Sequence, residues 1–168
     1  MHHNSILRLT LTLLAMLALA GPAAAGRQRR QEKQVPFRGQ LEGVATVAPR
    51  TPPFVSVDIE GSGHATQLGN FEVSIPHVTN RSNGTAVGSY EFTAANGDTL
   101  TADFTESFAP TDVPGVFSDV ITATITGGTG RFAGATGSFV SDRVADHVTG
   151  IVSDSFEGTI STPRQGKN

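Results

Sequence analysis

The chain has 168 residues, of which 15 are acidic and 12 are basic, and it contains neither cysteine nor tryptophan. Without cysteine no disulfide can stabilise the fold, so stability must come from apolar burial and strand pairing. The basic residues gather near the N-terminus, and residues 39–168 hold 14 acidic against 6 basic residues, a balance that excludes a nucleic-acid-binding surface.

The first 25 residues have the pattern of a secretory signal peptide. Arg8 supplies the positive start, residues 9–20 form an apolar run, and residues 23–25 are small alanines suited to cleavage. The apolar run is too short to span a bilayer comfortably, although an uncleaved membrane anchor is the alternative. Cleavage after Ala25 predicts a secreted or periplasmic protein with no stable membrane insertion.

Residues 37–162 are predicted to form one β-domain between a basic, flexible leader (26–36) and a C-terminal tail (163–168). No window shows a sustained apolar period of 3.6 residues, and Asn96-Gly97 is a strong hairpin signal. We expect eight strands, at 37–47, 54–61, 64–77, 84–95, 98–109, 116–127, 136–148 and 151–161, with GSG (61–63) as the turn between the second and third. Short antiparallel strands with short connections predict an all-β fold, namely an eight-stranded antiparallel β-barrel, with a sandwich as the alternative.

A glycine-rich run, GGTGRFAGATG, occupies residues 127–137. A phosphate-binding loop would need a helix after it and usually a lysine. The sequence that follows, TGSFVSDRVADHV, alternates like another strand, and no lysine is near. The run therefore predicts a tight reversal of the chain at a barrel rim.

The segment GGTGRFAGATGSF (127–139) resembles the signature of the dirigent and allene oxide cyclase-like barrels. Segments 61–74 and 95–105 are similar to bacterial secreted relatives, and the resemblance spans residues 37–161. It implies an eight-stranded barrel, often trimeric in plants, that holds a hydrophobic small molecule in its lumen without a cofactor. Plant members close a fatty-acid epoxide into a cyclopentenone, or steer the coupling or cyclisation of phenylpropanoid intermediates. The resemblance assigns no catalytic residue, because the carboxylates do not align with those of the plant enzymes.

Three predicted strands each place one acidic residue on an otherwise apolar face. These residues are Glu106, Asp119 and Asp154. A carboxyl group in a dry pocket has a raised pKa and can act as a general acid or base, so these three are the candidate catalytic residues. The alternative is that each lies at a rim with its oxygens in water.

The candidate ligand-binding residues lie on the same inward faces. Arg143, which shares its face with Phe139, is a possible partner for one of the acids. The aromatic candidates are Phe104, Phe108, Phe117, Phe139 and Phe156.

The remaining polar residues point to no other chemistry. His64, His77 and His147 lack the spacing of a metal site, so no metal is expected and each histidine is predicted to lie at the surface or to cap a strand. Two functions stay open. One is a barrel that binds a hydrophobic small molecule and steers its cyclisation or coupling. The other is a non-catalytic envelope module with a filled barrel.

Overall fold

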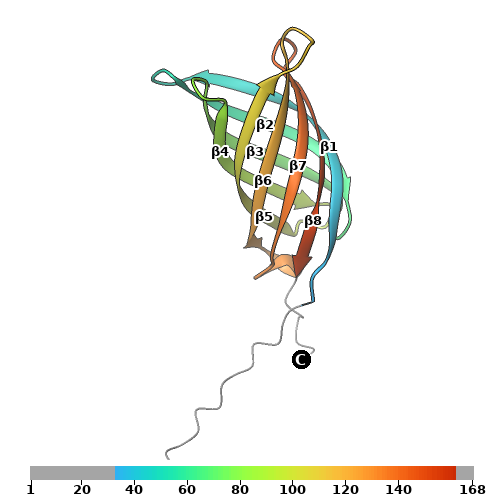
Figure 1. The fold of residues 1–168 in the computed structure, drawn as a ribbon. Helices are drawn as coiled ribbons and strands as arrows, with labels where there is room; N and C mark the ends of the chain where they lie inside the picture. The colour runs from blue at the N-terminus through green and yellow to red at the C-terminus, as the bar shows by residue number, and fades with distance from the viewer. Residues whose placement is uncertain (1–32, 162–168) are drawn as a thin grey trace, which may run out of the picture. The chain divides into compact units, whose positions relative to one another are not determined.

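The structure, a computed structural model, describes residues 33–161 of the chain. Eight antiparallel strands follow one another around a closed barrel (Figure 1): β1 (Val35–Pro49), β2 (Phe54–Ala65), β3 (Gly69–Asn80), β4 (Thr85–Ala94), β5 (Thr99–Pro110), β6 (Val116–Gly128), β7 (Thr136–Asp146) and β8 (Ile151–Ser161). Strand β1 also pairs with β8, from Val35 opposite Ile160 to Val44 opposite Ile151, and this pairing closes the sheet. The predicted barrel is confirmed, and the sandwich is excluded.

Both predicted terminal segments extend beyond the described residues. The predicted signal peptide and the tail at 163–168 lie outside the described residues, whereas the first strand begins at Val35, within the predicted leader. Between residues 33 and 161, no helix is long and apolar enough to cross a membrane.

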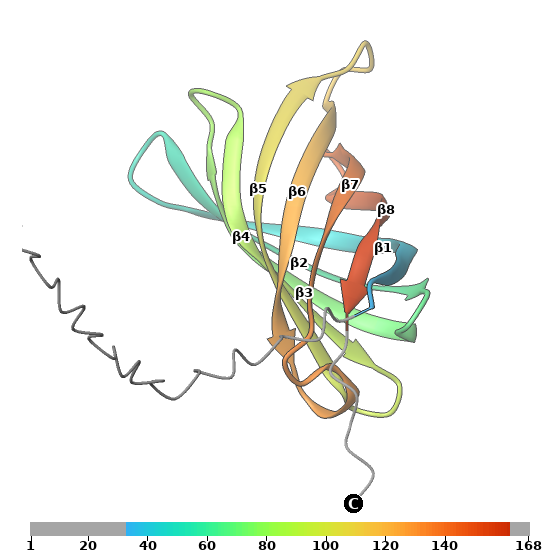
Figure 2. The same ribbon diagram turned by 60° about the horizontal axis from the view of Figure 1, so that its bottom comes forward.

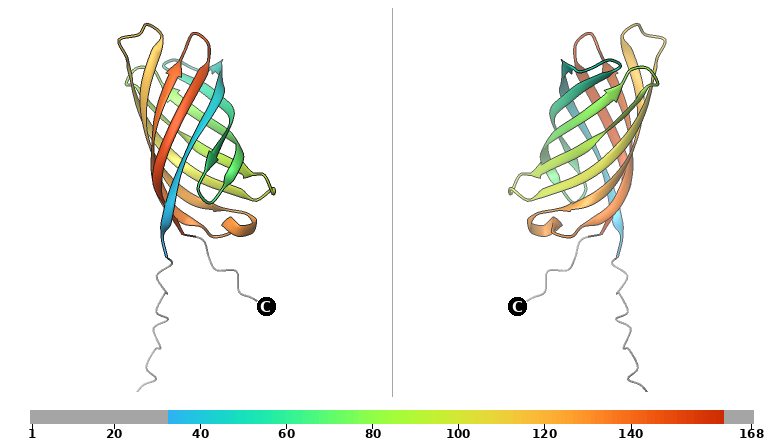
Figure 3. Two further views of the ribbon diagram at one scale, coloured as in Figure 1. Left: turned by 90° about the vertical axis from the view of Figure 1, so that its right-hand side faces the viewer. Right: turned by 90° about the vertical axis from the view of Figure 1, so that its left-hand side faces the viewer.

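The strands form the barrel wall and are tilted relative to the barrel axis (Figure 3). The connections between them lie at the two ends of the barrel. We call one the open end; its connections are residues 50–53, 81–84, 111–115 and 147–150. We call the other the closed end; its connections are residues 66–68, 95–98 and 129–135.

The glycine-rich run forms the largest connection of the closed end. It contains a 3₁₀-helix of three residues, η1 (Gly130–Phe132), and Gly130 and Gly134 have φ angles of +54° and +72° that favour glycine. Phe132 is buried, and the Arg131 guanidinium donates a hydrogen bond to the Leu68 carbonyl oxygen at 3.1 Å. Figure 2 brings this end forward, with η1 beside the β4–β5 connection. The predicted reversal at the rim is confirmed.

The predicted turn at residues 61–63 is wrong, because β2 continues through it to Ala65 and the chain turns at 66–68. Both glycines lie in the β1–β2 pairing, Gly61 opposite Gly43 and Gly63 opposite Leu41. A Cβ on Gly63 would collide with the Gln40 carbonyl oxygen and would lie 2.7 Å from the Phe71 ring. Glycine is present here because the strand packs too closely for a side chain, not because the chain reverses.

The interior of the closed-end half is solid. Seven aromatic side chains from six strands pack there with neighbouring ring centroids 5.1–6.5 Å apart. We call this group the aromatic cluster: Phe37, Phe71, Tyr90, Phe92, Phe104, Phe139 and Phe156.

Candidate functional site

A cavity of about 730 Å³ occupies the open-end half of the barrel. Its wall is mixed: apolar side chains that include Val57, Ile59 and Val152 make up about half of it, and polar or charged side chains make up the rest. This volume is within the range of small-molecule sites, roughly 300–1,000 Å³. The barrel is therefore divided into a filled half and a hollow half, and the polar side chains between them form the floor of the cavity.

Arg143 is the centre of that floor and is only 2% exposed. Its Nε donates to Asp154 Oδ1 at 2.7 Å, its Nη1 donates to Glu106 Oε2 at 3.1 Å, and its Nη2 donates to Asp154 Oδ2 at 3.1 Å. The same Nη2 donates to the Tyr90 hydroxyl oxygen at 3.2 Å, and that hydroxyl donates to Asp154 Oδ2 at 3.2 Å. We call these four residues the ion-pair layer. The bidentate contact between the Arg143 guanidinium and the Asp154 carboxylate fixes the Arg143 side chain in one orientation.

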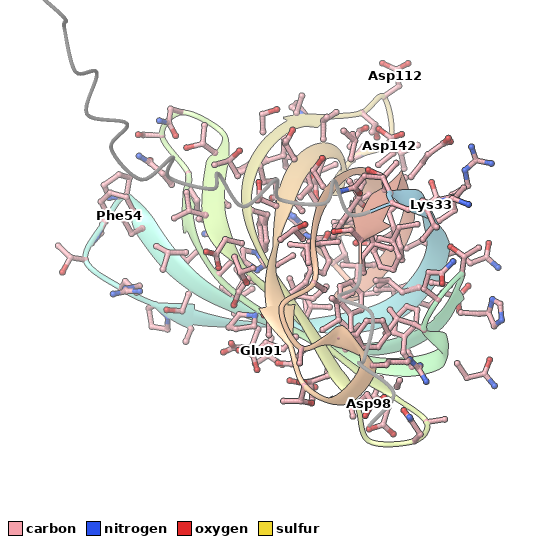
Figure 4. The ribbon with its side chains drawn as sticks, turned by 90° about the horizontal axis from the view of Figure 1, so that it is seen from below. Lys33, Phe54, Glu91, Asp98, Asp112 and Asp142 are labelled. Atoms are coloured by element: carbon pink, nitrogen blue, oxygen red, sulfur yellow. The ribbon has the colours of Figure 1, made fainter. Side chains whose placement is uncertain are left out.

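Strand alternation and register place Asp119 and Asp154 on either side of Arg143. In the β6–β7 pairing Asp119 lies opposite Arg143, and in the β7–β8 pairing Asp154 lies opposite it. Inward and outward residues alternate, so Asp142 next to Arg143 is exposed and lies on the outside of the barrel, as does Glu91 (Figure 4).

Burial raises the pKa of Glu106 to about 7, and Asp119 and Asp154 add to the rise. Arg143 opposes this rise, but its guanidinium is already largely neutralised by the closer Asp154 carboxylate. For Arg143 itself, burial alone would lower the pKa, and the Asp154 carboxylate outweighs burial so that the pKa is raised. Burial followed by Asp154 raises the pKa of Tyr90, which stays a neutral hydroxyl.

Asp119 differs from the other two acids because it has no cation bound to it. The residue is 4% exposed, and its Oδ1 is buried without a hydrogen-bond partner anywhere in residues 33–161. Burial raises the pKa of Asp119 to about 6, with Asp154 adding to the rise and Arg143 opposing it. Near neutral pH the cavity wall therefore carries an unpaired carboxylate, an arrangement that is costly unless something binds to it.

The structure divides the predicted site residues between the two halves of the barrel. The cavity wall contains Glu106, Asp119, Arg143, Phe108 and Phe117. The other predicted residues lie beneath it: Asp154 in the ion-pair layer, and Phe104, Phe139 and Phe156 in the aromatic cluster. Across the described part of the chain, no group of three or more residues could hold a metal ion.

The inward positions of two residues, His77 and Tyr90, were not predicted from the sequence. His77 was predicted to lie at the surface or to cap a strand, which is wrong: it is buried within β3, lines the cavity, and its Nδ1 lies 2.9 Å from the Ile75 carbonyl oxygen. Its inward position follows the alternation of Phe71, Val73 and Ile75, and Tyr90 likewise follows the inward faces of β4. Burial lowers the pKa of His77, so it is neutral near pH 7.

Replacing Asp119 with asparagine is expected to stabilise the protein at about pH 8. The pKa is 3.8 for an ordinary Asp and about 6 here, so the folded state binds the proton more tightly than the unfolded chain does. Such a group costs stability as pH rises from about 4 through about 6, and removing it should gain about 1–3 kcal/mol above that range and nothing below about pH 4.

Urea unfolding at both pH values measures this gain. The matched control is Asp142→Asn, which removes an exposed carboxylate on the neighbouring strand and should change stability by less than about 0.5 kcal/mol. Destabilisation by D119N at both pH values would show that the Asp119 carboxylate is satisfied in the folded protein.

The closed eight-stranded topology and its aromatic interior define the class of protein: the chain has a dirigent-like β-barrel fold. No family model matches the sequence, and no curated protein matches it. The resemblance found in the sequence is thus confirmed at the level of the fold.

Two solved structures carry this comparison. One is the pterocarpan synthase dirigent protein PsPTS1, which superimposes with a TM-score of 0.62 at 11% identity, over 80% of this chain and 99% of that one. The other is the pterocarpan synthase dirigent protein GePTS1, with a TM-score of 0.59 at 14% identity, over 84% of this chain and 91% of that one.

Proposed function

We propose that the protein, secreted or periplasmic, binds a hydrophobic small molecule in the open-end cavity. The observation that carries this proposal is the cavity itself, about 730 Å³, which combines a set of apolar wall side chains with buried carboxyl groups. Because the ion-pair layer forms the floor and the aromatic cluster supports it from below, the polar groups are held in place before a ligand arrives.

A second candidate function is that the barrel also steers the cyclisation or coupling of its ligand. The raised pKa values of Glu106 and Asp119 favour it, because a carboxyl group that titrates near pH 7 can both donate and accept a proton. The two solved structures with this fold are named as pterocarpan synthase dirigent proteins, and a synthase role for this chain would be consistent with those names.

The chemistry would need no cofactor. The protonated carboxyl group gives its proton to an oxygen of the ligand, the C–O bond breaks, and its electron pair stays on that oxygen. A nucleophile of the same ligand forms the new bond to the carbon and returns its own proton to the carboxylate. Confinement in one reactive conformer would supply most of the acceleration, up to roughly 7–11 kcal/mol in the best cases.

The rival, a non-catalytic envelope module, is supported by the filled half of the barrel. A variant that blocks the cavity separates the two ideas. Val57→Trp places a large ring in the cavity wall, whereas Val87→Trp places the same ring on the outside of β4, where Val87 is 58% exposed.

Native mass spectrometry of the purified protein, after exposure to fatty-acid and phenolic extracts, is expected to show one retained small molecule per chain. The V57W variant should lose that molecule, and V87W should keep it, because only the first fills the cavity. Matching melting temperatures would show that both variants are folded. Wild-type protein that retains nothing from any extract would favour the envelope module.

A further inference from the structure

The wall around Asp119 has two aromatic rings. Phe117 precedes Asp119 by two residues on the same inward face of β6, and Phe108 lies directly opposite Asp119 in the β5–β6 pairing. The two rings are 5.9 Å apart between centroids at an interplanar angle of 73°, and both are half-buried. The carboxylate thus has one ring beside it along its own strand and one ring across from it.

The third neighbour of Asp119 is Arg143 on β7, and it is occupied elsewhere. Its guanidinium donates to Asp154, to Glu106 and to the Tyr90 hydroxyl, and Asp119 Oδ1 stays buried without a partner within the described residues. Buried polar atoms in native structures nearly always have partners, so an orphaned carboxylate oxygen at a cavity wall indicates a donor that arrives with a ligand.

The charge balance around the cavity favours a positively charged donor. The charged groups at its wall and floor are four carboxyl groups and two guanidiniums: Glu106, Asp119, Asp146, Asp154, Arg81 and Arg143. Burial lowers the pKa of both His77 and His147, so neither contributes a positive charge near neutral pH. An anionic ligand would increase the excess of negative charge, and a neutral alcohol would leave it unchanged.

We infer that the ligand of the proposed binding function is a hydrophobic amine in its protonated form. Its ammonium group donates to the Asp119 carboxylate and lies against the rings of Phe108 and Phe117, and its apolar part lies along the valines of the cavity wall. The carboxylate supplies a charge-assisted hydrogen bond, and the rings supply cation–π attraction in a partly desolvated site. This inference rests on the proposed function, because it names the chemical class that the same cavity would accept.

The test is isothermal titration calorimetry with three probes of equal chain length at about pH 8, namely octylammonium, 1-octanol and octanoate. Octylammonium is expected to bind at least about tenfold more tightly than 1-octanol, and octanoate the least tightly. Asp119→Asn should reduce the affinity for octylammonium by about tenfold and change that for 1-octanol by less than about threefold. Asp142→Asn, on the outside of the barrel, should leave all three affinities unchanged.

Phe117→Leu provides a second variant that keeps the apolar volume and removes the ring. It should weaken octylammonium binding by several-fold and leave 1-octanol binding in place. Wild-type protein that binds 1-octanol as tightly as octylammonium, with D119N unchanged, would overturn the inference while leaving the proposed binding function intact. Failure of all three probes to bind would overturn both.

Discussion

Replacing Arg143 with methionine is expected to lower the free energy of unfolding by about 3–5 kcal/mol at about pH 8. The substitution preserves much of the side-chain volume but leaves Glu106 and Asp154 as buried carboxylates without a cation. The loss should shrink as the pH is lowered towards about 4, because buried carboxyl groups without a cation take up protons and become neutral. Urea unfolding monitored by circular dichroism across this pH range measures the effect.

The chain offers a matched control on its outer surface. Arg38 donates to Glu157 at 2.6 Å, but the two side chains are 61% and 70% exposed, so Arg38→Met should cost less than about 1 kcal/mol. The stability loss of Arg143→Lys should lie between those of R143M and R38M. Lysine retains the positive charge but lacks the planar guanidinium that donates to several partners at once. An R143M variant as stable as the wild type would show that the ion-pair layer adds nothing to the folded state.

Phe92→Ala is expected to cost about 3–5 kcal/mol, because it removes a ring from the middle of the aromatic cluster. Phe92 is fully buried and stacks on Tyr90 with centroids 5.3 Å apart and an interplanar angle of 3°. It also contacts Phe37 and Phe71 edge-on, so the surrounding rings cannot collapse into the space without losing their own contacts.

Thermal unfolding measures this loss, and Phe54→Ala is the control. Phe54 is 42% exposed at the open end, and its removal should change stability by less than about 1 kcal/mol. At a temperature where F92A is folded, 1-octanol binding should be within a few-fold of wild type, since Phe92 does not line the cavity. Loss of 1-octanol binding in folded F92A would mean that the shape of the cavity wall, and not only the position of the acids, depends on the aromatic cluster.

The division of the barrel has a consequence for function. A fully filled barrel of this size would leave no room for a ligand, and a fully hollow one would have no rigid floor to hold its acids. Here Tyr90 packs against the other rings of the aromatic cluster, and its hydroxyl contacts both Arg143 and Asp154. The Arg143 Nη1 in turn donates to Glu106. The acids at the cavity are therefore positioned by packing that starts at the opposite end of the molecule.

Alternation along each strand made much of the architecture predictable from the sequence. An inward position repeats every second residue, so Glu106, Asp119, Arg143 and Asp154 were placed inside before any pairing was known. The eight strands and the rim position of the glycine-rich run followed from turn chemistry, which is local. The same alternation places His77 and Tyr90 inside, in line with Ile75 and Phe92 on their strands.

Only the tertiary structure decided which buried side chains bind one another and where in the barrel the cavity lies. Asp119 and Asp154 both lie opposite Arg143, yet only Asp154 is bound by its guanidinium, because that choice depends on how the side chains pack in three dimensions. Gly61 and Gly63 have the local sequence of a turn. Glycine is needed there because β1, about 20 residues earlier in the chain, packs closely against β2, and the local sequence does not contain that contact. Which end is filled and which is hollow depends on side-chain volumes summed over all eight strands, a quantity that no single stretch of sequence contains.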